Sequence, residues 1–152
     1  TCPNKDGSKG SGGCIFCDGG SGYFTHRLPS VSEQLNAEKE RICTRNGDNS
    51  PIIAYFQANT NTYAPVNTLR KSYNEALAFQ NVCGISIGTR ADCLSDDVLD
   101  LLSEINTRTY LTVELGMQSV HNTTIELINR CCTHEEFLDG YFRVPKVLGE
   151  GA

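Results

Sequence analysis

Several features are missing from this sequence, and each absence excludes a class of protein. No apolar run approaches the roughly 18 residues that a membrane-spanning helix needs, and no charged segment followed by an apolar one resembles a secretion signal. Basic residues are outnumbered, with 13 Lys and Arg against 18 Asp and Glu and a formal net charge of −5. We therefore expect no membrane segment, a cytoplasmic location and no strong non-specific binding to nucleic acid.

An initiator methionine is also missing, since the chain begins with Thr1. The 152 residues suffice for one domain with a substantial core but are short for two. We expect the chain to be a fragment of a longer protein whose beginning lies upstream.

Cysteine, by contrast, is plentiful, with eight residues. Small disulfide-rich domains lack long helical and strand patterns because the bridges replace a core, whereas most of the cysteines here lie within such patterns. These are Cys43, Cys83, Cys93, Cys131 and Cys132. We expect most of these five to be buried thiols in a reducing compartment.

Three short apolar segments have the composition of buried β-strands. They are residues 52–56, 82–87 and 110–113. A polar loop and then a segment with helical spacing follow each one, the helical segments being 69–79, 95–105 and about 122–130. A further polar helix is expected at 32–41, with Ser30 or Ser32 as its N-cap. Strands that alternate with helices predict βα units and a parallel α/β sheet, covered on both faces or closed into a barrel.

Each predicted strand runs into a polar loop, and the three loops read QANTNTYAP, GTRAD and ELGMQS. In parallel sheets, ligands bind at the carboxyl ends of the strands. Because the strands are parallel, the three loops lie at the same edge of the sheet. The sequence therefore predicts a binding site at this edge.

The opening segment, TCPNKDGSKGSGGCIFC, places Cys2, Cys14 and Cys17 among glycines. A structural zinc ion needs four ligands, and His26 or Cys43 would have to serve as the fourth. A redox Cys-x-x-Cys pair would leave Cys2 and the glycines without a role. Three thiolates suit a cubane [4Fe–4S] cluster with one open iron, and glycine permits the dihedral angles of a loop wrapped around it. We favour the cluster, with zinc as the alternative.

Four segments, taken in order, resemble YhcC-type radical S-adenosylmethionine proteins, a family related to the Elongator catalytic subunit. They are TCPNKDGSKGSGGCIFC, IAYFQANTNTYAP, GISIGTRADCLSDDVLDLLSE and VELGMQSVHNTTIELINR, and the resemblance covers about residues 1–130. It implies a TIM-like (βα)6 radical SAM barrel, of which this chain would hold a part. It also implies a [4Fe–4S] cluster that cleaves S-adenosyl-L-methionine reductively to methionine and a 5′-deoxyadenosyl radical, which abstracts hydrogen from a substrate. An electron donor such as flavodoxin or ferredoxin is implied as well.

The resemblance also implies roles for single residues. Cys2, Cys14 and Cys17 would bind the cluster. The residues expected at the cofactor are Phe16 near its adenine; Gln57, Asn59 and Thr60 at its amino end; Thr89, Arg90 and Asp92; Glu114 and Gln118 near its ribose or the substrate; and Arg130 near its carboxylate.

Simpler interpretations of these residues also stand. Arg90 and Asp92 form a local ion pair, Glu114 caps the following turn, and Asn59 and Asn61 are ordinary turn formers. Cys131 and Cys132 stand where relatives carry glycine.

We divide the chain into a cysteine-rich cluster-binding loop at 1–27, βα repeats of the radical SAM core at 28–132, and a C-terminal segment, 133–152, in which the pattern is lost. Three strands cannot close a barrel, so we expect a truncated barrel with uncovered sheet edges through which it self-associates.

Two alternatives are a non-catalytic, zinc-stabilised α/β binding module and an enzyme-derived fragment without its cluster. The substrate stays open between RNA bases, peptides and small molecules. The wide spacing of the first two cysteines favours tRNA, while the acidic net charge does not.

Overall fold

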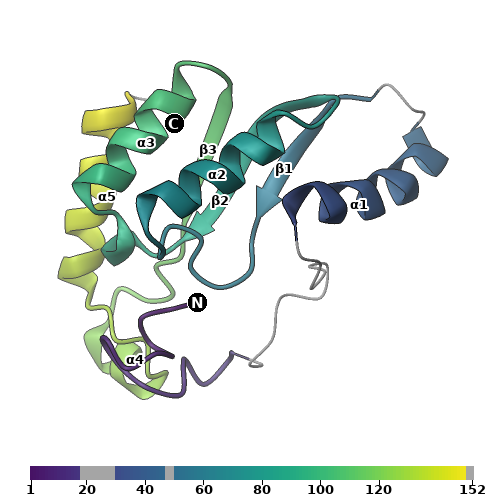
Figure 1. Cartoon of the computed structure of the whole chain (residues 1–152). Helices are drawn as coiled ribbons and strands as arrows, with labels where there is room; N and C mark the ends of the chain where they lie inside the picture. The colour runs from purple at the N-terminus through teal and green to yellow at the C-terminus, as the bar shows by residue number, and fades with distance from the viewer. Residues whose placement is uncertain (18–29, 47–49, 150–152) are drawn as a thin grey trace.

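The computed structural model describes residues 1–17, 30–46 and 50–149 (Figure 1). It contains a parallel sheet of three strands in the order β1-β2-β3, which confirms the predicted α/β class. The strands are β1 (Ile52–Phe56), β2 (Val82–Thr89) and β3 (Tyr110–Leu115). Each lies where an apolar segment predicts it, and β2 and β3 extend two residues further into their polar loops.

Helices alternate with the strands as expected. They are α1 (Val31–Asn46), α2 (Val66–Leu77), the short 3-10 helix η1 (Ala91–Cys93), α3 (Asp96–Asn106), α4 (Asn122–Leu127) and α5 (His134–Leu148). Ser30 is the N-cap of α1, as predicted, because its hydroxyl accepts a hydrogen bond from the Glu33 backbone N–H at 3.1 Å. None of the helices in the described ranges is long and apolar enough to cross a membrane.

Helix α4 is shorter than the predicted 122–130 and ends at Leu127. Asn129 and Cys131 have φ of 51° and 50°, in the left-handed region. A helix cannot continue through such residues. The segment after α4 therefore turns sharply, and Arg130 lies inside this turn rather than on a helix.

Helix α5 is missing from our prediction, which leaves 133–152 as a segment of uncertain structure; in the described residues up to 149 it forms a helix and no strand. Thr133 and Glu136 form a capping box, in which each side chain accepts from the other residue's backbone N–H. The helix packs on η1 and α3. Gly140 permits this close approach, because a Cβ there would overlap the Ala91 carbonyl oxygen.

One face of the sheet carries the core. Helices α2 and α3 lie against it (Figure 1). The buried side chains of this core are Ala54, Leu69, Tyr73, Ala76, Ile85, Ile87, Leu94, Val98, Leu99, Leu101, Leu102, Ile105, Leu111, Val144 and Leu148. Tyr73 also donates its hydroxyl to the Asn61 carbonyl at 2.7 Å, which joins α2 to the loop after β1.

The opposite face of the sheet is open within the described residues. Strand side chains alternate between the two faces, and this face presents Ile53, Tyr55 and Tyr110 at 49%, 47% and 61% exposure. Gly84 leaves room for the Tyr110 ring, which lies beside it on the neighbouring strand. The part of the chain that the structure describes thus covers the sheet on one side.

Candidate functional site

The N-terminal loop, residues 1–17, lies across the carboxyl ends of the strands and beside α4 (Figure 1). Two backbone hydrogen bonds attach it: Thr60 N–H donates to the Thr1 carbonyl at 3.2 Å, and Ile15 N–H donates to the Ile128 carbonyl at 3.0 Å. Within the loop, Gly12 and Gly13 have φ of 79° and 80°. Glycine adopts this conformation without strain, so these two residues let the chain turn back toward Cys14.

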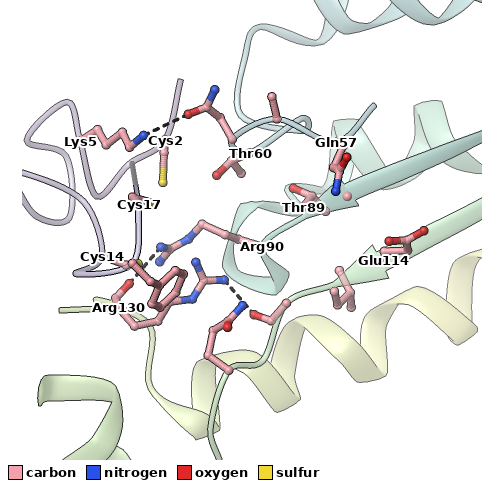
Figure 2. Close-up of a pocket in the computed structure, with 17 residues that line it drawn as sticks. Cys2, Lys5, Cys14, Cys17, Gln57, Thr60, Thr89, Arg90, Glu114 and Arg130 are labelled. Carbon is pink, nitrogen blue, oxygen red and sulfur yellow. Dashed lines mark hydrogen bonds between the residues drawn. The ribbon is translucent and has the colours of Figure 1, made fainter. Parts of the chain in front are cut away.

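A cavity of about 540 Å³ lies between this loop and the strand ends. Figure 2 shows the cysteines on one side, Gln57, Thr89 and Glu114 on the other, and Arg90 and Arg130 between them. The predicted site residues that line it are Cys2, Cys14, Phe16, Cys17, Gln57, Asn59, Thr60, Thr89, Arg90, Glu114, Gln118 and Arg130. Asp92 is the one predicted site residue that does not line this cavity. Residues from five separate segments of the sequence therefore meet in one place.

The three cysteines differ in exposure. Cys2 and Cys14 are buried, Cys17 is exposed, and all three are free thiols. Within the described ranges, no three His, Cys, Asp or Glu side chains converge closely enough to hold a single metal ion. Iron–sulfur clusters are held by Cys thiolates, so the three cysteines that line this cavity have the donor chemistry that a cluster needs. His26 and the Cys43 side chain, the predicted fourth zinc ligands, lie outside the described residues.

Arg130 lies on the cavity wall and is 8% exposed. Its Nη2 donates to the Gly116 carbonyl at 2.8 Å, which fixes the guanidinium. Its Nε is buried and has no partner in the described part of the chain. A buried charged donor without an acceptor is costly, so this guanidinium is suited to an anionic ligand such as a carboxylate.

Arg90 and Asp92 form the local ion pair that the simpler interpretation predicts. Two parallel hydrogen bonds of 2.8 Å join the guanidinium to the carboxylate. Arg90 also donates to the carbonyls of Arg130 and Cys131 at 3.0 and 2.9 Å. It therefore ties the end of β2 to the turn after α4, and its contact with a cofactor stays a prediction.

Asp92 connects the site to the N-terminal loop. Lys9 Nζ lies 2.7 Å from the Asp92 carboxylate and 2.8 Å from that of Glu136, at the start of α5. Burial alone would raise the pKa of Asp92, but hydrogen bonds from Arg90 and Lys9 outweigh it and lower the pKa to about 2. Nothing in the sequence pattern indicated Lys9, because its two partners are distant along the chain.

Glu114 is held across the sheet rather than in a cap of the following turn. Its carboxylate accepts hydrogen bonds from Tyr55 at 2.6 Å and from Ser86 at 2.9 Å. The hydrogen bond to Glu114, together with burial, raises the pKa of the Tyr55 hydroxyl. Both carboxylate oxygens are thus fixed at the edge of the cavity.

The remaining polar strand ends are partly structural. Asn59 has φ of 63°, as a turn former does, and its side chain accepts from Lys5 Nζ at 3.3 Å. Asn61 donates to the carbonyls of both Phe56 and Gly88 at 2.8 Å and so joins β1 to β2. The turn-former interpretation is confirmed for Asn59, which also lines the cavity.

The other cysteines are less buried than we predict. Cys132 is buried and Cys93 half-buried, but Cys83 is exposed at the start of β2 and Cys131 is only half-buried. Burial raises the pKa of Cys93 to about 12 and that of Cys132 to about 11, so both are protonated thiols at neutral pH. Only Cys132 among the described four fulfils the prediction of a buried thiol.

The chain is similar to three bacterial and archaeal proteins. It is 48% identical over 147 residues to "Uncharacterized protein YtqA" of Bacillus subtilis, covering 95% of this chain and 45% of that protein. It is 42% identical over 132 residues to "Protein YhcC" of Escherichia coli K12, covering 86% and 41%. With "Uncharacterized protein MJ0486" of Methanocaldococcus jannaschii it shares 36% over 135 residues, covering 85% and 40%.

No family model and no solved structure matches the chain. The chain spans less than half the length of the curated relatives that it matches. The similarity to each of them extends over 85% of this chain or more, a range that takes in most of the cavity described above.

Proposed function

We propose that this chain is the cofactor-binding part of a radical S-adenosylmethionine enzyme of the YhcC type. One observation carries the proposal: Cys2, Cys14 and Cys17 line a single cavity with the polar ends of all three parallel strands. Similarity to YhcC over 86% of the chain supports the same assignment. Since the relatives are more than twice as long, the activity belongs to the whole protein.

The residues present suit the [4Fe–4S] cluster and S-adenosyl-L-methionine. Cys2, Cys14 and Cys17 would hold the cluster, because these three thiols line one cavity. When bound, the two groups supply a 5′-deoxyadenosyl radical that abstracts hydrogen from the substrate. The Arg130 guanidinium, whose Nε has no acceptor within the described residues, would bind the carboxylate of the methionine part.

The strand ends would orient the rest of the cofactor. Glu114 offers a carboxylate that Tyr55 and Ser86 hold in place. This carboxylate is suited to accept a hydrogen bond from a ribose hydroxyl or from the substrate. Gln57 and Thr60 follow the end of β1 and line the same cavity, where they would form hydrogen bonds with the amino group of the cofactor's methionine part. Phe16 from the loop would contact the adenine.

The open face of the sheet supports a barrel in the whole protein. Ile53 and Tyr110 are half-exposed or more on this face, and exposed apolar side chains on a sheet call for a cover. Further βα units from the rest of the longer protein would close a (βα)6 barrel and turn this face inward. The whole enzyme would act in the cytoplasm with a flavodoxin or ferredoxin as electron donor, and tRNA is one candidate substrate.

The test is anaerobic reconstitution with iron and sulfide, followed by metal analysis and EPR of the reduced protein with and without S-adenosylmethionine. We expect roughly four irons per chain and a signal that changes when the cofactor is added. Cys14→Ala should abolish the cluster. Cys83→Ala is the matched control, since Cys83 is exposed at the opposite end of β2, and it should leave the cluster intact. One tightly bound zinc and no iron would instead establish the zinc-stabilised module.

A further inference from the structure

Asn4, between the first two cysteines, is completely buried at 0% exposure. Its side-chain nitrogen lies 3.6 Å from Cys14 Sγ, a hydrogen-bond distance for sulfur. The same nitrogen donates a hydrogen bond to the backbone carbonyl of Asn129. The backbone carbonyl of Asn4 accepts a hydrogen bond from the Gly13 N–H at 2.8 Å. Asn4 thus contacts the Cys14 sulfur without being one of the residues that line the cavity.

The hydrogen bonds of the Asn4 side chain show which atom of the amide is the nitrogen and which is the oxygen. An asparagine nitrogen carries two hydrogens, and here one faces the sulfur and the other the Asn129 carbonyl. A flipped amide would turn its oxygen toward two acceptors. The oxygen is left buried without a partner in the described ranges, which is unfavourable for folding. The arrangement therefore directs both amide hydrogens at acceptors, at the expense of the amide oxygen.

The loop is shaped around this amide. Gly10 lies against it, since a Cβ at Gly10 would overlap Asn4 Oδ1 and come within 2.7 Å of Cys131 Sγ. The side chain of Asn129 donates to the carbonyls of Gly13 at 2.8 Å and Ser11 at 3.3 Å. The close packing of Gly10 fixes the Asn4 amide, so its N–H is aimed at the sulfur before any ligand binds. The Asn129 side chain only attaches Ser11 and Gly13 to the turn after α4.

We propose that Asn4 is a positioning residue for the cluster and raises its reduction potential by donating a hydrogen bond to the Cys14 thiolate. Hydrogen bonds to the cysteine sulfurs are among the groups that set the potential of an iron–sulfur cluster. An N–H dipole stabilises the reduced state more, because that state carries one more negative charge. The inference rests on the proposed function, since it requires a cluster bound to Cys14.

The experiment compares three forms of the full chain after anaerobic reconstitution: wild type, Asn4→Leu and Asn129→Gly. Leucine matches the shape of asparagine and has no donor. Asn129→Gly removes two hydrogen bonds to the N-terminal loop and one accepted from Cys131 Sγ, but it keeps the backbone carbonyl, and glycine accepts the φ of 51°. The readouts are iron and sulfide content, circular dichroism, and the midpoint potential from a redox titration followed by EPR.

We expect Asn4→Leu to shift the midpoint potential to a more negative value, while Asn129→Gly leaves the potential of the bound cluster unchanged. A folded Asn4→Leu protein that takes up no cluster, beside an Asn129→Gly protein that does, also supports the proposal. Equal potentials in all three forms, equal shifts in both variants, or loss of the cluster from both would overturn it.

Asn4→Asp is the second variant, for the case that leucine prevents folding. It has the shape of asparagine but offers a carboxylate in place of the amide hydrogens, so it should also shift the potential to a more negative value. An unchanged potential would refute the role of Asn4. If the wild type itself takes up no iron and sulfide, the proposed function fails and this inference fails with it; if the wild type holds a cluster and the variants keep its potential, this inference fails alone.

Discussion

The N-terminal loop and the sheet with its helices are held in place by different forces. Ile85 and Leu102 in the core are fully buried, whereas the largest apolar side chains of the loop, Ile15 and Phe16, are 69% and 54% exposed. The loop is attached instead by ion pairs such as Lys9 with Asp92 and by hydrogen bonds. Hydrophobic burial is strong but non-directional, while hydrogen bonds fix geometry at a small net gain. The core thus supplies stability, and the loop supplies the precise placement of the cysteines.

The largest effect on stability is expected in the core. Leu102→Ala removes buried methyl groups and leaves a cavity, so it should lower the free energy of unfolding by about 3 kcal/mol. Leu127→Ala is the control, because Leu127 is 76% exposed and its loss should change that free energy by less than about 0.5 kcal/mol. Urea titrations of both variants measure the difference. Similar values for the two would show that burial does not set the stability of this chain.

A smaller effect should arise where the loop is attached to the core. The folded-state pKa of Asp92, about 2, lies below its ordinary value of 3.8, so its ionisation stabilises the folded chain by about 2 kcal/mol above pH 4. This contribution is lost as the pH falls from about 4 toward 2. Asp92→Asn should therefore be destabilised at pH 7, and its difference from the wild type should narrow below pH 4.

Unfolding curves of Asp92→Asn and the wild type between pH 3 and 7 test this. Glu104→Gln is the control, since Glu104 pairs with Arg70 and Arg108 at the exposed surface and such pairs contribute little. A constant gap between Asp92→Asn and the wild type across this range would contradict a depressed pKa for Asp92.

Gly140→Ala tests the contact between α5 and η1. The added methyl group would overlap the Ala91 carbonyl, and overpacking of this kind costs about 1–3 kcal/mol. Alanine gains up to about 1 kcal/mol in helix propensity, so we expect a net loss of about 1 kcal/mol in the free energy of unfolding. Asp139→Ala, at the exposed neighbouring position, should show no loss. Increased stability of Gly140→Ala would mean that α5 packs more loosely than the structure shows.

The smallest effect on stability should accompany a large effect on the site. Gly10→Ala would push Asn4 and Cys131 aside, so we expect much reduced iron uptake on reconstitution. The free energy of unfolding should change by less than about 1 kcal/mol, because the loop opens locally. Ser11→Ala, an exposed neighbour, should keep wild-type iron content. A large loss of stability in Gly10→Ala would remove the distinction between loop and core.

The success of the sequence analysis follows the same division. All three strands and α3 have strong apolar patterns, and the structure confirms them. Helix α5 was missed because its C-terminal half contains Pro145 and its apolar residues are interrupted by Gly140, although its capping box of Thr133 and Glu136 was readable as T-x-x-E. The capping box would therefore have indicated the start of α5 even though the apolar periodicity of this segment is weak.

The site was predictable in outline because parallel strands bring their polar ends to one edge. The sequence alone indicated the βα order, the three cysteines and the polar loops, since these depend on residue type and spacing along the chain. Only the tertiary structure decided that Lys9 contacts Asp92, that Asn4 contacts Cys14, and that Arg130 Nε finds no acceptor among the described residues. Such contacts join residues far apart in sequence through directional hydrogen bonds, and no local pattern encodes the distance between them.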